Sequence, residues 1–479
     1  MVIFPIRMHS VPLISFVAFL TASLLMAGCE LSSSLEEDDE PITGIRFSRD
    51  VLPVLEQKCA SCHASAVEPG PAVGLSLESW ELLIRGSDFG EVVIPFAAER
   101  SLLVRMVSNL EGGVHPTGEG AQTLTASELE RLREWISEGA RSDAGVVPFS
   151  DAENLLYVCN QEDATVGVVD TDLNVVVRLV DLREFGFSSS AMPHHVAVEP
   201  DGSAWYVSLI GDNVVARFDR DNNLEGVFTF ETPGMLALDP KSDWLYVGRS
   251  LSAPDPPQSV GRIRRSDMSG EEIPVVFPRP HALVVGPEGQ YVYSASLGAN
   301  QLIVIRSEDD EVSFTPVSGQ LHSFVQHAVS PDGSLLASSA QLTSSVIFFD
   351  LADPAQPSQI WSTGTNARPW HPSFSVDGNW LFVGNLGANT VSFISIANRR
   401  VESIVTGGGL AEPHGSFVSA DGLTLYVSNR NTDETYVPRH DFGDNSKTGT
   451  IAVIDIPTRQ IVKVLEVGRF AAGMAGRAR

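Results

Sequence analysis

Residues 413–429 are PHGSFVSADGLTLYVSN, two apolar runs separated by the turn pair Asp421-Gly422. An Asp-Gly pair between two β-rich runs is typical of a β-hairpin. Related text recurs upstream at intervals of 40 to 49 residues, so this stretch is one copy of an internal repeat. The second runs of the seven copies begin at Tyr157, Tyr206, Tyr246, Tyr293, Leu336, Phe382 and Tyr426.

This repeat predicts an all-β propeller of seven blades with four strands each, because short alternating strands at this period are typical of propellers. The ends of the repeat region favour closure of the ring over an open solenoid. The first copy begins at Asn154 without a preceding strand, and an apolar run from Phe470 to Ala475 follows the last copy. We therefore expect this C-terminal run to complete the first blade and leave no open sheet edge.

The repeats resemble the YVTN family of seven-bladed propellers over residues 150–479. The family pattern is a Pro-His pair, a turn and a Tyr-Val-x-Asn run, and residues 413–429 match it best. The third copy departs from the pattern, with Gly234-Met235 at the histidine position and Lys241-Ser242 in the turn. The resemblance implies the architecture and leaves the activity open, since one fold carries many functions.

The composition narrows the class of protein. Among 479 residues, 32 Lys+Arg stand against 60 Asp+Glu, which gives a net charge of −28. This excess of acidic residues argues against binding to nucleic acid, because few cations remain to neutralise phosphates. The hydrophobic fraction of 43% excludes general disorder. Four cysteines are too few for a disulfide scaffold of this length.

The first thirty residues have the pattern of an export signal. Arg7 precedes an apolar run at 11–26, which is shorter than the roughly 20 residues that span a bilayer. Residues 25–29 resemble the lipobox of bacterial lipoproteins, apart from Met26 where Leu is usual. The resemblance implies a signal peptide at 1–28 and lipidation of Cys29, and an ordinary secretory signal is the alternative. The Ser-rich and acidic residues 29–43 are expected to form a tether.

The strongest chemical motif is Cys59-Ala60-Ser61-Cys62-His63, the C-x-x-C-H pattern of covalent c-type haem. In this pattern Cys59 and Cys62 bind the two vinyl groups of one haem, and His63 is the proximal ligand of its iron. A thioredoxin-like site needs a βαβ setting, which is missing here. A zinc site needs a second ligand pair, and the chain has no other C-x-x-C. The predicted cofactor is therefore one covalent haem c.

The surroundings of this motif are predicted to be helical. Helices are expected at 47–58 and 101–107, and Thr125 with Glu128 forms a capping box before a third helix. Residues 47–140 resemble the cytochrome c domain of Planctomycete-type fusion proteins, through Asp50-Val51 before the motif and Trp135-Ile136 after it. The resemblance implies a small all-α class I cytochrome c domain at 44–148.

The second axial ligand is less sharply defined. The resembled family usually has a Met-Pro pair before the last helix, and this chain has His115-Pro116 there. We expect His115 to be the distal ligand, with Met106 as the second choice and an open or water-ligated iron as the third. A histidine in place of methionine implies a lower haem potential.

Six of the eleven histidines fall near the start of a blade's first strand, where they would line the central channel. They are His194, His195, His281, His327, His371 and His414. Converging imidazoles suit a second metal ion or an acid–base site, and lining a ligand or capping strands are the alternatives. The six histidines lie at different numbers of residues before the turn that follows each of them. Because successive side chains of a strand point to opposite faces, we expect these histidines to point to opposite faces unless a bulge intervenes.

The repeat region contains one further cysteine and one long insertion. Cys159 lies on a blade strand and is expected to be a small buried side chain. Residues 429–447 form a long polar insertion, for which a flexible surface loop is favoured over a lid or a contact with the cytochrome domain.

The sequence thus predicts an exported haem c protein of the bacterial cell envelope, which meets the membrane through its N-terminal lipid only. Its function would be electron transfer with a periplasmic redox partner protein, and the propeller would present a platform for that partner or for a substrate not identified by the sequence. As an enzyme it would be an oxidoreductase. The alternative is a non-catalytic binding protein whose propeller recognises a protein or polymer.

Overall fold

The computed structural model describes residues 44–66, 70, 72–108, 115–116, 122–250 and 257–477. The chain from Ile45 to Arg479 forms one compact unit. The expected signal peptide at 1–28, Cys29 and the tether up to residue 43 lie outside the described residues. Within the described ranges, no helix is both long enough and apolar enough to span a bilayer.

The first part of this unit is helical. The α-helices are α1 (Leu52–Lys58), α2 (Ala60–His63), α3 (Trp80–Arg85), α4 (Leu102–Val107) and α5 (Ala126–Ser137). A π-helical turn at Phe47–Val51 leads into α1, and 3₁₀ turns lie at Ala72–Gly74, Ala98–Arg100 and Leu182–Phe185. The helices expected at 47–58 and 101–107 are present, and the Cys-x-x-Cys-His motif occupies the residue before α2 and α2 itself.

Helix α5 begins at the predicted capping box. The Thr125 hydroxyl accepts a hydrogen bond from the backbone of Glu128 at 3.3 Å, and the Thr125 backbone donates to the Glu128 carboxylate at 2.6 Å. Such a cap stabilises a helix by about 1 kcal/mol. The buried face of α5 includes Trp135, whose ring centre lies 5.5 Å from that of Phe47. The last helix is thereby fixed to the turn that precedes the motif.

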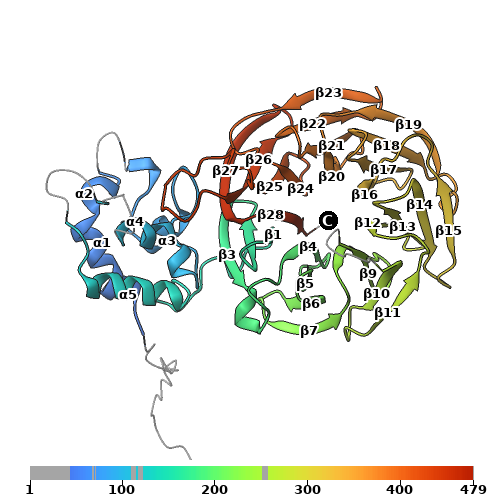
Figure 1. Ribbon diagram of the computed structural model, residues 1–479. Helices are drawn as coiled ribbons and strands as arrows, with labels where there is room; N and C mark the ends of the chain where they lie inside the picture. The colour runs from blue at the N-terminus through green and yellow to red at the C-terminus, as the bar shows by residue number, and fades with distance from the viewer. Residues whose placement is uncertain are drawn as a thin grey trace, which may run out of the picture. The chain divides into compact units, whose positions relative to one another are not determined.

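The rest of the unit is a ring of seven four-stranded antiparallel sheets (Figure 1). In blade one β28 (Ala471–Gly476) precedes β1 (Leu155–Asn160), β2 (Thr165–Asp170) and β3 (Val175–Asp181). Blade two consists of β4 (Pro193–Val198), β5 (Ala204–Leu209), β6 (Val214–Asp219) and β7 (Leu224–Thr229). Blade three consists of β8 (Pro233–Leu238), β9 (Trp244–Arg249), β10 (Ser259–Arg264) and β11 (Gly270–Pro274). Blade four consists of β12 (Pro280–Val285), β13 (Tyr291–Ser296), β14 (Gln301–Arg306) and β15 (Val312–Pro316). Blade five consists of β16 (Phe324–Val329), β17 (Leu335–Ala340), β18 (Ser345–Asp350) and β19 (Ser358–Gly364). Blade six consists of β20 (Pro369–Phe374), β21 (Trp380–Asn385), β22 (Thr390–Ser395) and β23 (Arg400–Val405). Blade seven consists of β24 (Pro413–Val418), β25 (Thr424–Asn429), β26 (Thr448–Asp455) and β27 (Gln460–Arg469). The seven-bladed propeller expected from the repeat is confirmed over residues 155–476.

Closure of the ring is confirmed as well. Strand β28 pairs with β1, so the C-terminal strand completes the first blade (Figure 1). The Tyr426 hydroxyl, on the last blade, lies 2.7 Å from the side-chain oxygen of Asn174, which joins two strands of blade one. Because β28 covers the edge of β1, the C-terminal strand is the innermost strand of blade one and closes the ring.

The turn signals of the repeat have the conformations that their residues favour. Gly202, Gly333, Gly378 and Gly422 have φ between 71° and 74°, a region that L side chains rarely adopt. In the same turns the preceding aspartate accepts a backbone hydrogen bond from the residue two positions later, as at Asp377, where the distance is 3.0 Å. The third blade forms although Lys241-Ser242 replaces this turn, because Asp239 accepts hydrogen bonds from both backbone N–H groups.

The first strands of the blades lie next to one another around the axis, in the order β28, β4, β8, β12, β16, β20 and β24. Five of these strands carry the six histidines of the channel. Register shifts occur at or beside the histidines in each of these five strands. These bulges change the simple two-residue alternation and turn the imidazoles toward the axis. Cys159, on β1, is fully buried as expected.

Candidate functional site

A cavity of about 890 Å³ lies between the helical segment and the first and last blades. Its lining includes Cys59, Cys62, His63, Met106 and His115, which are all of the residues expected to anchor and ligate a haem. Cavities that hold cofactors in proteins span roughly 300–1,000 Å³, so the volume suits a group of this size. The structure thus gathers around one space five residues that span 57 positions of the chain.

His63 and His115 both line this cavity, with ring centres 6.1 Å apart and ring planes tilted by 50°. Two imidazoles that bind one metal ion from opposite sides have ring centres about 6–6.5 Å apart, since each metal–nitrogen bond is about 2 Å long. Nδ1 of His63 lies 3.2 Å from the Leu75 carbonyl oxygen, which can only accept, so Nδ1 carries the hydrogen. The lone pair is then on Nε2, the atom that binds iron in a proximal histidine.

His115 and Met106 both remain candidates for the distal position. Burial lowers the pKa of His115, and the neighbouring His63 and His440 lower it further, so its imidazole is neutral and able to bind metal at pH 7. Met106 lines the same cavity from α4, where it is half-buried. The 6.1 Å between the ring centres of His115 and His63 is a separation at which two imidazoles can share a metal ion.

The thiol of Cys59, the first cysteine of the motif, is partly buried. Burial raises the pKa of the Cys59 thiol to about 11, and the neighbouring Cys62 contributes to the shift. Thioredoxin-like cysteines have lowered pKa values, because the thiolate is the reactive form. The raised pKa keeps the Cys59 thiol protonated at pH 7, which distinguishes it from the reactive cysteine of a thioredoxin-like pair.

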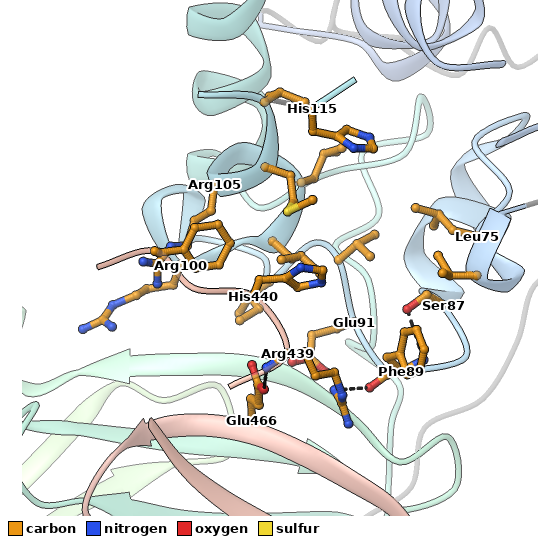
Figure 2. Close-up of a pocket in the computed structure, with 18 of the residues that line it drawn as sticks. Leu75, Ser87, Phe89, Glu91, Arg100, Arg105, His115, Arg439, His440 and Glu466 are labelled. Atoms are coloured by element: carbon orange, nitrogen blue, oxygen red, sulfur yellow. Dashed lines mark hydrogen bonds between the residues drawn. The ribbon is translucent and has the colours of Figure 1, made fainter. Parts of the chain in front are cut away.

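The insertion at 430–447 forms a wall of the cavity and is packed against the helical segment. Its Asp444 accepts an ion-paired hydrogen bond from Arg105 at 2.5 Å, and the Arg105 guanidinium lies 4.0 Å from the centre of the Phe442 ring. Arg439 donates to the Phe89 carbonyl oxygen at 2.9 Å (Figure 2). The preference for a flexible surface loop was wrong, because these long-range contacts to Arg105 and Phe89 hold the insertion in place.

Glu91 is a cavity residue that sequence reasoning missed. Burial raises the pKa of its carboxyl to about 7, although the Val176 backbone N–H donates to it at 2.9 Å. Figure 2 shows Glu91, His440 and His115, which belong to different segments, around the same space. No local motif marks Glu91, because its burial arises only when β3 packs against the 86–97 segment.

The second candidate site is the propeller axis. The His194 ring centre lies 5.8 Å from those of both His281 and His414, and the His371 ring centre lies 4.6 Å from that of His414. His195 joins the group through His371 at 5.9 Å. Since His194 is on blade two and its neighbours are on blades four and seven, the rings meet at the axis and do not belong to one blade interface.

Several nitrogen atoms of this group lack a hydrogen-bond partner among the described residues. They are Nε2 of His194, His281, His327 and His371 and both ring nitrogens of His414. Each buried polar group without a hydrogen bond lowers the stability of the fold by about 1–3 kcal/mol. Folded proteins therefore rarely contain many such groups. Burial lowers the pKa of these imidazoles, to about 4 for His281 and about 3 for His327, and they are neutral at pH 7.

The axial histidines are not placed as a metal site in this structure. In the part of the chain that the structure describes, no three His, Cys, Asp or Glu side chains are arranged to hold a metal ion. The second metal expected from the sequence therefore stays a prediction. The charge of Arg430 lowers the pKa of His194, His281, His371 and His414.

Comparisons with known proteins agree with the fold and leave the activity open. No family model matches the chain. A functionally unknown protein from Desulfotomaculum acetoxidans has a similar crystal structure, with a TM-score of 0.56 and 14% identity over 68% of this chain and 99% of that chain. A streptogramin B lyase structure aligns with a TM-score of 0.48 and 13% identity, over 58% of this chain and 87% of that one.

A curated relative is the uncharacterised protein YwhL of Bacillus subtilis, which is 28% identical over 153 residues. The match covers 31% of this chain and 30% of the relative, so the chain spans less than a third of that protein's length.

Proposed function

We propose that this chain is an exported haem c protein that transfers electrons, with its propeller as the platform for a partner or substrate. The observation that carries the proposal is the pair His63 and His115, with ring centres 6.1 Å apart beside two free thiols in one cavity. Export to the cell envelope, with a lipid on Cys29, is part of the proposal, because c-type haem is attached outside the bacterial cytoplasm.

In this proposal the residues have separate tasks. Cys59 and Cys62 hold the haem covalently, and His63 and His115 ligate its iron. The Leu75 carbonyl fixes the orientation of His63 through the hydrogen bond at Nδ1. When bound, haem c supplies a one-electron redox centre. The insertion at 430–447 closes the cavity on the propeller side and limits the access of water.

The test is the visible spectrum of the reduced, full-length holoprotein before and after addition of carbon monoxide. We expect no spectral change, because two histidine ligands leave no open position for the gas. A rapid and complete change would show an open distal position, which would contradict electron transfer by a six-coordinate iron and favour a ligand-sensing role.

Glu91 provides a prediction on pH dependence. An oxidised centre carries one more positive charge than a reduced one, so oxidation lowers the pKa of the nearby Glu91 carboxyl, whose pKa is about 7. Reduction is then accompanied by proton uptake, and the midpoint potential falls as pH rises through 7, by at most about 59 mV per pH unit.

Potentiometric titration between pH 5 and 9 checks this expectation. Glu91→Gln should flatten the slope near pH 7, while Glu99→Gln, an exposed lining residue paired with Arg133, should leave it unchanged. A slope that persists in Glu91→Gln would assign the proton to another group.

A further inference from the structure

Several hydrogen-bonding atoms of the axial histidines have no partner among the described residues. Nε2 of His281 and both ring nitrogens of His414 are buried and unpaired among the described residues, and each of these side chains is only 1% exposed. Native proteins satisfy nearly all such atoms with protein groups, water or a ligand. Neighbouring ring centres are 4.6 to 5.9 Å apart, so one small group could contact several of these imidazoles.

Arg430 is the cationic group whose charge acts on His194, His281, His371 and His414. The Arg430 guanidinium lies between two aromatic rings, 4.8 Å from the Trp370 centre and 4.7 Å from the Phe470 centre. Its Nε is buried without a partner in the part of the chain that the structure describes. Among the groups that shift the pKa of Arg430 most, Glu412 is the only carboxylate. No carboxylate is among the groups that shift the pKa of the six imidazoles most. A metal cation would meet a fixed positive charge here, whereas an anion would be attracted.

The hydrogen-bonding pattern provides both donors and acceptors. The Leu236 backbone donates to Nδ1 of His195 at 3.3 Å, so the neutral His195 carries its hydrogen on Nε2. Nδ1 of His281 lies 2.8 Å from the Val325 carbonyl oxygen, which only accepts, so Nε2 of His281 has a lone pair. His195 and Arg430 can therefore donate to an anion, while His281 can accept a proton that accompanies it.

We propose that the propeller axis binds a small oxyanion of the carboxylate type, with Arg430 as its counter-charge and the axial histidines as hydrogen-bond partners. Binding takes up a proton, because a negative charge among the neutral imidazoles favours their charged form. The titratable and charged groups coupled to His281 are His194, His195, His327, His371 and Arg430. This site is separate from the haem cavity and does not depend on the haem proposal.

The test is calorimetric titration of the full-length holoprotein with sodium formate at pH 6, in two buffers that differ in ionisation enthalpy. We expect saturable binding with one formate per chain, and a buffer-dependent enthalpy that reports proton uptake. The visible spectrum of the haem should stay unchanged during the titration, which separates this site from the iron.

Variants of Arg430 identify the site. Arg430→Gln should weaken formate binding by about tenfold or more, since a hydrogen bond to a charged group is lost, and Arg430→Lys should retain most of the affinity. The control is Arg459→Gln, which removes an arginine that also lies over a tryptophan ring, at 5.2 Å from Trp380, but outside the axis.

Three results would overturn the proposal. One is absence of formate binding to the folded wild-type protein, which would leave water as the occupant. Another is equal affinity in the wild type and in Arg430→Gln. The third is a stoichiometric metal ion besides iron that is lost in His281→Gln, which would make the axis a metal site.

Discussion

Combined substitution of Cys59→Ala and Cys62→Ala is expected to abolish covalent haem attachment and leave the propeller folded. Both thiols line the cavity that holds His63, and no other cysteine of the described residues reaches it. Haem staining after denaturing electrophoresis measures the covalent group, and circular dichroism reports the β-rich fold. We expect complete loss of staining with an unchanged β signal, because the helical segment contributes little to the seven sheets.

The matched control is Cys159→Ala. Cys159 is buried in β1 on the propeller, outside the lining of the cavity, so this variant should stain like the wild type. Retention of a covalently bound haem by the double variant would refute the assignment of Cys59 and Cys62 as its anchors.

The second large effect is expected from His115→Met, which should raise the midpoint potential of the haem by on the order of 0.1 V or more. A methionine ligand favours the reduced iron relative to histidine, and axial ligands set haem potentials over roughly 0.8 V. Potentiometry of the full-length protein measures the change, and the reduced spectrum shows whether the iron stays six-coordinate.

Met106→Leu serves as the control for this experiment, since Met106 lines the same cavity and was the second choice from the sequence. It should leave the potential and spectrum unchanged. If Met106→Leu changes the spectrum and His115→Met does not, Met106 is the distal ligand and the assignment of His115 is wrong.

The local patterns of the sequence predicted the elements of the fold well. The capping box at Thr125 and Glu128, the Asp-Gly turns and the closing strand near residues 470–475 each depend on residues close together in the chain. Each of these features is determined by residues that are neighbours in the sequence. They could therefore be predicted without knowing how distant parts of the chain pack together.

The direction of the axial histidines could not be predicted in this way. Counting from the turns directs His194 and His195 to opposite faces of β4, and the structure brings both into the ring cluster because the register shifts between Pro193 and His195. A bulge inserts one residue on one strand only, and nothing in the local residue pattern shows where it falls.

Long-range contacts were missed for a related reason. Arg430 appeared in the sequence as one polar residue of an insertion, and only the closed ring brings it between Trp370 and Phe470. The ion pair of Arg105 and Asp444 joins positions more than three hundred residues apart, which no periodicity of the chain encodes. Such contacts follow from the packing of whole elements.

The central claim, covalent haem c at Cys59 and Cys62, is tested most directly by the iron and haem content of the full-length protein. The protein should be produced in a host that attaches c-type haem and exports it. The account predicts one iron per chain, held as haem that stays with the polypeptide after denaturation. A folded, exported protein without iron would contradict it.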